Sequence, residues 1–139
     1  MDGQSNPKIQ RTAHGMLVAW GYFSRLLHLA ERLRQVVTIP RHHENIPAAD
    51  LILEFGLLLL SGSTQLQDLN QGPSPLTKDE AVREAWQVRL GHYTSVSRAL
   101  KAATADTVSL VVAVLDEISQ PFIEQEVAAL ILQGQGLAP

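Results

Sequence analysis

The sequence PAADLILEFGLLLL at residues 47–60 decides the fold class of this chain. Proline suits the first turn of a helix, because the N–H that it lacks would have no partner there, and good helix formers follow it. Leucines cover nearly all sides of this helix, which predicts the most buried helix of the protein. They are Leu51, Leu53, Leu57, Leu58 and Leu60. Asp50 and Glu54 share one face at four-residue spacing, but no third cation ligand is evident, and we expect both carboxylates to be solvated.

Apolar residues also recur at three- and four-residue steps before this segment, which predicts helix over residues 12–35. Gly21 and Ser24 are the positions where that helix is expected to divide. The β-branched run at residues 36–39 ends at Pro40 and predicts an extended connection. No convincing strand alternation appears anywhere in the sequence, so the predicted fold class is all-α, a compact multi-helix domain.

A capping box predicts the start of another helix, over residues 78–87. Thr77 can accept from the backbone at the helix start, and Glu80 follows three residues later. Trp86 lies on the apolar stripe of this helix, as Trp20 does on the stripe of the first one. Burial in the core is the expected role of both rings.

The sequence GHYTSVSRAL at residues 91–100 predicts a turn that opens into a short helix capped by Thr94. Val96 and Leu100 would face the core, so small hydroxyls and a basic side chain would face outward. Together with the helix before it, this segment predicts a helix-turn-helix whose second helix contacts DNA. The predicted DNA-binding residues are Thr94, Ser95, Ser97, Arg98 and Lys101.

A long helix is predicted for the last third of the chain, where apolar residues recur over 108–118 and again over 122–131. Pro121 interrupts it, so we expect a kink, or a restart capped by Ser119. The glycine-containing end, residues 134–139, is expected to stop the helix. Basic residues are absent after Lys101, so this part of the chain is purely acidic and should face away from any DNA.

Composition limits the class of protein. The chain has 139 residues, 45% of them hydrophobic and 18% charged, which predicts one folded domain over residues 13–136 between short tails at 1–12 and 137–139. There is no cysteine, which excludes disulfides and thiolate chemistry, and a cytoplasmic location is expected. The most apolar run is about half the ~20 residues that cross a bilayer, so no membrane role is expected.

No active site is predicted. His42, His43 and Glu44 are adjacent and lack a further ligand at helical spacing, so a polar loop is the favoured interpretation over a metal site. His92 is expected to make a local hydrogen bond and not to act as a general base. The sequence therefore predicts no catalytic residue, no metal site and no cofactor.

Short motifs follow one another along residues 46–137. They are PAADL (47–51), LLLLSG (57–62), LQDLNQGP (66–73), KDEAV (78–82), AW (85–86), HYTSVSRAL (92–100) and PFIEQEV (121–127). In this order they resemble the N-terminal region of a group of bacterial insertion-sequence transposases of DDE type. The likeness covers most of the chain.

The resemblance implies a helical DNA-binding or transpososome-assembly region that precedes a catalytic domain of RNase H-like fold. The three acids of that domain bind divalent metal and cut DNA, and the first of them would lie beyond residue 139. The expectation is therefore a truncated, non-catalytic transposase region with DNA as its partner. Two alternatives remain: a helical module that forms a homodimer or packs against the catalytic domain without binding DNA, or an inactive transposase relic.

Overall fold

The computed structural model describes residues 12–39 and 45–137, and all regular secondary structure in these two ranges is helical. The chain is all-α, as predicted. The α-helices are α1 (Gly15–Leu26), α2 (Leu29–Val36), α3 (Ala48–Leu60), α4 (Glu80–Trp86), α5 (Tyr93–Ala102) and α6 (Ala105–Leu137). Two short 3₁₀ helices, η2 (Leu66–Leu69) and η3 (Leu76–Lys78), lie between α3 and α4.

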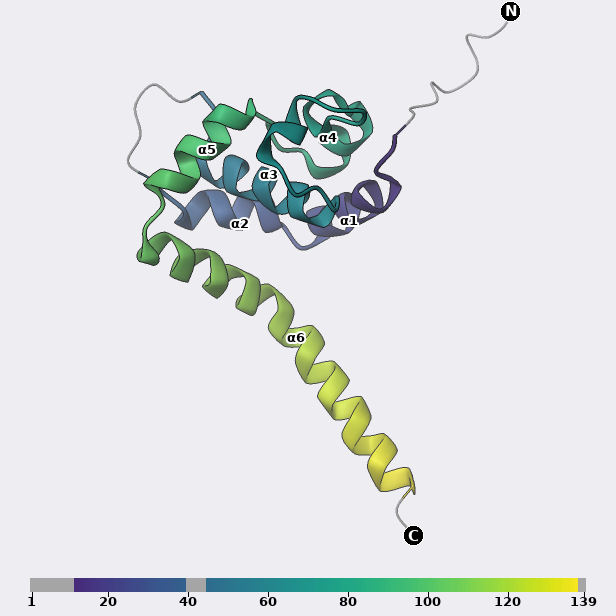
Figure 1. Ribbon diagram of the computed structural model, residues 1–139. Coiled ribbons are helices and arrows are strands. Elements are labelled where there is room, and N and C mark those ends of the chain that lie inside the picture. The colour runs from purple at the N-terminus through teal and green to yellow at the C-terminus, as the bar shows by residue number, and fades with distance from the viewer. Residues whose placement is uncertain (1–11, 40–44, 138–139) are drawn as a thin grey trace, which may run out of the picture.

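Helices α1 to α5 form a compact body, and α6 leaves it along one side (Figure 1). Within the body α1 packs on α4, while α3 contacts both α2 and α5. Helix α6 contacts α2 near its start, and its second half then extends away from the other helices (Figure 1). The molecule therefore has a body with an internal core and one projecting helix.

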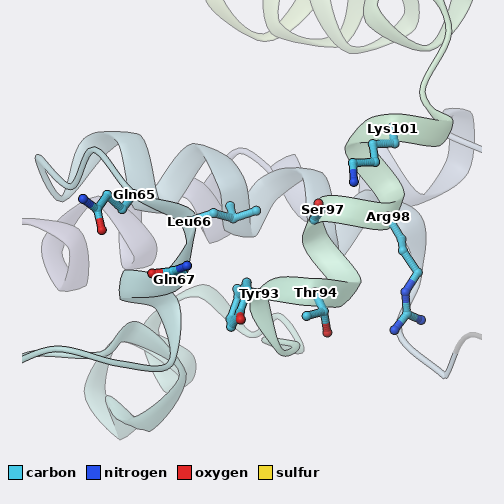
Figure 2. Close-up of a pocket in the computed structure, with 8 residues that line it drawn as sticks. All are labelled: Gln65, Leu66, Gln67, Tyr93, Thr94, Ser97, Arg98 and Lys101. Atoms are coloured by element: carbon cyan, nitrogen blue, oxygen red, sulfur yellow. The ribbon is translucent and has the colours of Figure 1, made fainter.

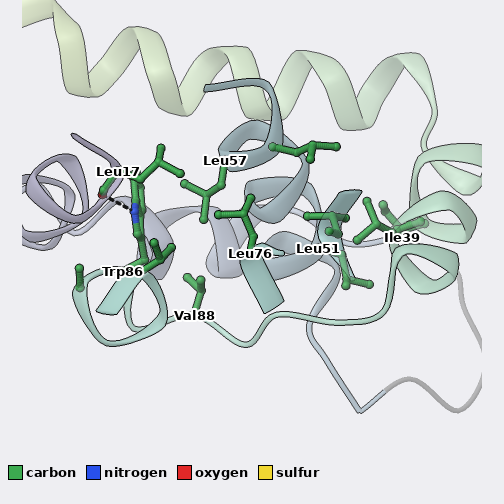
Figure 3. Close-up of a cluster of buried hydrophobic side chains, with 13 residues drawn as sticks. Leu17, Ile39, Leu51, Leu57, Leu76, Trp86 and Val88 are labelled. Carbon is green, nitrogen blue, oxygen red and sulfur yellow. Dashed lines mark hydrogen bonds between the residues drawn. The ribbon is translucent and has the colours of Figure 1, made fainter. Parts of the chain in front are cut away.

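Helix α3 contributes six buried residues to the core, more than any other described helix, which confirms the prediction made from its leucines. Leu51 and Leu57 are fully buried in the main cluster of apolar side chains, which Figure 3 shows. The predicted burial of Leu60 is wrong, because α3 ends at the surface and leaves this side chain 55% exposed.

Helices α1 and α4 share the most extensive contact between two helices of the body. Trp86 is buried, and its Nε1–H donates to the Leu17 carbonyl oxygen at 2.8 Å (Figure 3). A Cβ on Gly21 would lie 2.7 Å from Trp86 Cδ1, so only glycine fits there. The prediction for Trp20 is wrong: its ring is 40% exposed, because α1 turns a narrow face to α4 and the rest to solvent.

The first predicted helix divides later than expected, between α1 and α2. The break is at His28, whose φ of 58° is left-handed and ends the α1 turn. Gly21 is needed for the α4 crossing, and Ser24 stays within the helix, where its Oγ–H donates to the Gly21 carbonyl at 2.7 Å. Val37 is extended, as predicted, whereas Pro40 lies outside the described residues.

Neither predicted N-cap is the residue that caps. Asp79 caps α4, since its Oδ1 accepts from the Val82 N–H at 3.1 Å, and Thr77 instead donates to the Leu69 carbonyl at 2.8 Å. His92 caps α5 in place of Thr94. Helix α4 packs on α1 and α5 packs on α3 and η2, so the pair lacks the mutual packing of a helix-turn-helix, and that motif is not confirmed.

Helix α6 continues without a break from Ala105 to Leu137, so of the two alternatives predicted at Pro121 the restart near Ser119 does not occur. Its last residue, Leu137, lies within the segment 134–139 that was expected to stop the helix. Pro121 is accommodated inside the helix, and Ser119 donates its hydroxyl to the Leu115 carbonyl, one turn back. Figure 1 shows that the helix changes direction in its middle part.

Candidate functional site

An open groove of about 700 Å³ separates α5 from the first turn of η2 (Figure 2). Four of the five residues predicted to bind DNA line it: Thr94, Ser97, Arg98 and Lys101. They share the outward face of α5, as the spacing of its buried residues requires. The amino group of Lys101 turns toward Ser97, and the Arg98 guanidinium extends away from the opposite wall (Figure 2).

The opposite wall consists of Gln65, Leu66 and Gln67, and Tyr93 closes one end; none of the four was predicted as a site residue, although Leu66 and Gln67 lie in the LQDLNQGP motif. The two walls are separated by more than 20 residues of chain, and no pattern in the sequence signals that they meet. Tyr93 lies in the HYTSVSRAL motif directly before Thr94, so its place beside the predicted site could have been inferred from the sequence.

Ser95 is the predicted site residue that does not line the groove. Its Cβ lies 3.7 Å from the point where a Cβ on Gly91 would stand, so it faces the loop before α5. Helix α5 begins at Tyr93, after the cap His92, and Ser95 precedes the buried Val96. The Ser95 side chain therefore lies on the side of α5 that faces the body.

Hydrogen bonds hold the two walls of the groove in register. The Tyr93 N–H donates to Asn70 Oδ1 at 2.6 Å, and Asn70 Nδ2 donates to Thr77 Oγ1 at 3.1 Å. At the start of α5, the Thr94 N–H donates to His92 Nδ1 at 3.2 Å, which confirms the predicted local role of His92. The groove is thus built before any ligand arrives, which reduces the entropy lost on binding.

Two acids of α3 fix the loop that leads into α5, and the prediction that they are solvated is wrong. Asp50 is 2% exposed, pairs with Arg34 through bonds of 2.7 and 3.1 Å, and accepts from the Arg89 N–H at 3.0 Å. Glu54 is fully buried and accepts from the Gly91 N–H at 2.7 Å. These donors come from distant parts of the chain, so spacing within α3 could not reveal them.

The charge of these two acids is largely cancelled. Burial raises the pKa of Glu54 to about 8, the Gly91 N–H opposes the shift and the charge of Asp50 adds to it. Glu54 is therefore mostly protonated at pH 7. The hydrogen bond from Arg34 to Asp50 raises the pKa of the guanidinium, which therefore keeps its positive charge beside the Asp50 carboxyl.

The described ranges contain neither a candidate metal-binding cluster nor a candidate membrane-spanning helix. Within residues 12–39 and 45–137 there is no group of three or more His, Asp or Glu side chains that could hold a metal ion. The histidines and the glutamate at positions 42–44 lie outside the described residues. No helix of the described chain combines the length and apolar character needed to span a bilayer.

Comparison of the chain with protein-family models, curated proteins and solved structures found no match. The likeness to transposases therefore rests on the sequence motifs alone.

Proposed function

We propose that this chain is the helical DNA-binding region of an insertion-sequence transposase and that the groove beside α5 contacts DNA. The observation that carries the proposal is that four residues selected from the sequence converge on one groove with two basic side chains. Its location is the cytoplasm, where bacterial DNA is found, and the proposal assigns no chemical step to this chain.

The groove offers the groups that DNA contacts use. Arg98 and Lys101 would neutralise phosphates, and Arg98 has in addition the fork of donors that pairs with guanine. Thr94 and Ser97 supply hydroxyl donors for phosphate oxygens. Glutamine amides on the opposite wall match the donor and acceptor pair of an adenine edge. Helix α6 supports the proposal by its position, because it contacts α2 and its second half extends away from the body that carries the groove (Figure 1).

Fluorescence anisotropy with a mixed-sequence DNA duplex tests the proposal. Binding should weaken steeply as salt rises, because neutralised phosphates release counterions. The double variant Arg98→Ala/Lys101→Ala should lower the slope of log K against log salt by about 2 and weaken binding by ~1–3 kcal/mol. Arg83→Ala is the matched control, since Arg83 is an exposed base on α4 that pairs with Glu80. Absent binding, or an equal loss in both variants, would contradict the proposal.

A second proposal concerns protein partners. We infer that the chain also assembles with another protein surface through its helices. This surface would belong to a second copy of the chain or to a catalytic domain, as in the alternative of a helical interaction module. Exposed apolar side chains support it: Val127, Leu130 and Ile131 of α6 are 48–58% exposed. Contiguous exposed apolar surface of this kind marks interaction sites.

A further inference from the structure

Apolar side chains gather on two helices at the surface of the molecule. All are between 40% and 76% exposed. We call this surface the α1/α6 patch; it comprises Met16, Trp20, Phe23 and Leu26 of α1 and Phe122, Ile123, Val127, Leu130 and Ile131 of α6.

The two halves of the patch adjoin, although about 100 residues separate them in sequence. The rings of Phe23 and Phe122 lie 6.2 Å apart between centroids, inclined at 60°. Leu26 and Phe122 also line one hollow of about 310 Å³ together with Ile118 and Pro121. The apolar surface is therefore continuous from α1 onto α6.

The chain does not cover this patch itself. Helix α6 has 33 residues, a length of about 50 Å. Among residues 105–134, Thr107 and Val114 are the buried ones, and both precede Pro121. Beyond Pro121 no other helix lies beside it (Figure 1). A helical segment of ~15 residues is marginally stable alone in water, so this part of α6 needs an outside surface to pack against.

The size of the patch suits a protein interface. Nine large apolar side chains at roughly half exposure present on the order of 700 Å². Each partner in a stable complex of standard size buries ~800 Å². The patch with its polar rim therefore meets the requirement of one stable contact.

The charges at the edges of the patch differ between its halves. Glu124 and Glu126 lie beside the α6 half, and α6 contains no basic residue. Arg25 lies beside the α1 half, exposed and over the Tyr22 ring at 5.6 Å, and α1 contains no acidic residue. A twofold rotation that lays α6 of one copy on α1 of the other brings acid to base at both ends, so the patch is self-complementary.

From this self-complementarity we propose that the partner is a second copy of the chain. Two α1 helices and the second halves of two α6 helices form a four-helix bundle about a twofold axis, with Arg25 of each copy facing Glu124 and Glu126 of the other. The inference rests on the second proposal above, that a protein surface covers these helices, and it is independent of DNA binding in the groove.

Sedimentation equilibrium of the full chain measures the association. The wild-type chain should have twice the 15.2 kDa of one copy. Ile123→Asp/Val127→Asp should raise the dissociation constant by at least ~100-fold, because it places charge in the bundle core. The control Leu132→Asp should leave the constant within about threefold, since this exposed side chain lies half a turn away from Ile123 on α6. Circular dichroism and urea unfolding of the body verify that each variant is folded.

Charge exchange in trans identifies the arrangement. Arg25→Glu and Glu124→Lys/Glu126→Lys should each weaken self-association by about tenfold or more, because like charges then face each other. An equimolar mixture of the two variants should dimerise like the wild type, since every contact in the mixed pair joins acid to base. A monomeric wild type, or a dimer that the apolar and charge variants leave intact, would overturn the second-copy inference. Loss of DNA binding would bear only on the first proposal.

Discussion

Helices α3 and α6 are both rich in apolar residues, yet the structure treats them in opposite ways. In α3, with 13 residues, the fully buried side chains include two leucines and also Glu54. In α6, with 33 residues, large apolar side chains such as Leu130 and Leu132 are more than half exposed. Apolar spacing predicts that a segment is helical, but its burial depends on which neighbours surround it.

The acidic residues of the same two helices repeat the contrast. Asp50 and Glu54 of α3 lie in the core. Arg34 and the Arg89 N–H donate to Asp50, and the Gly91 N–H donates to Glu54 Oε1, whereas Glu54 Oε2 has no hydrogen-bond partner among the described residues. The acids of α6 are exposed. One of them, Glu117, forms an ion pair of 2.8 Å with Arg32 at the surface of the molecule. A buried acid therefore organises the fold around it, whereas an exposed one mainly sets the charge of a surface.

Leucine truncation gives the largest expected difference between the two helices. Leu51→Ala should lower the free energy of unfolding by about 4 kcal/mol, because it removes a fully buried side chain and leaves a cavity. Leu132→Ala should change it by less than about 0.5 kcal/mol, since this side chain is 67% exposed and alanine favours helix. Urea unfolding of both variants measures the difference, and similar losses would contradict the contrast between α3 and α6.

The titration of Glu54 is the next largest effect. Its pKa is about 8 in the folded chain and ~4.3 in an unfolded one, so between these values the folded state holds a proton that the unfolded state has released. The contribution of Glu54 to the free energy of unfolding is therefore largest at low pH and decreases as the pH rises through the pKa of the folded state. From pH ~5 to pH ~8 the decrease should be about 3 kcal/mol.

The variant Glu54→Gln is the matched control, because glutamine keeps the acceptor for the Gly91 N–H and does not titrate. Urea unfolding of both proteins at the two pH values isolates the contribution of Glu54. An identical pH dependence in the two proteins would show that this carboxyl is ionised in the fold.

Sequence reasoning succeeded where a local rule decides the structure. The all-α class, the buried α3 and the core position of Trp86 all follow from residue spacing within one helix. It failed where another segment decides. Trp20 has the same kind of spacing as Trp86, yet its side chain is left 40% exposed. The cap of α4 moved from Thr77 to Asp79 because Asn70 and Leu69 engage the threonine.

The residues of the candidate site also fall into those that one helix determines and those that depend on another segment. Thr94, Ser97, Arg98 and Lys101 share one face of a single helix, so their common exposure was predictable. The groove wall of Gln65, Leu66 and Gln67 and the hydrogen bond from the Arg89 N–H to Asp50 depend on contacts between distant segments. No spacing rule reports such contacts, since they arise only when the helices pack.

The two tryptophans allow a sharper comparison within one body. Trp86→Phe should lower the free energy of unfolding by about 2 kcal/mol, because it loses the buried hydrogen bond to the Leu17 carbonyl and part of its packing. Trp20→Phe should have an effect below ~0.5 kcal/mol, as the ring is partly exposed and stays aromatic. Urea unfolding at a fixed protein concentration measures both, and a larger loss from Trp20→Phe would place that ring in a covered surface.

The smallest expected effect concerns the ion pair that joins the body to α6. Arg32→Gln removes the contact with Glu117, and the free energy of unfolding should fall by less than ~0.5 kcal/mol, because both side chains are well exposed and water screens the pair. Val114 instead packs under α2 with Leu33 and Val37 of the second apolar cluster, so truncating it should matter more. Hydrogen exchange in α6 separates the two causes. If Arg32→Gln accelerated exchange in α6 more than Val114→Ala did, the ion pair and not apolar packing would hold α6 to the body.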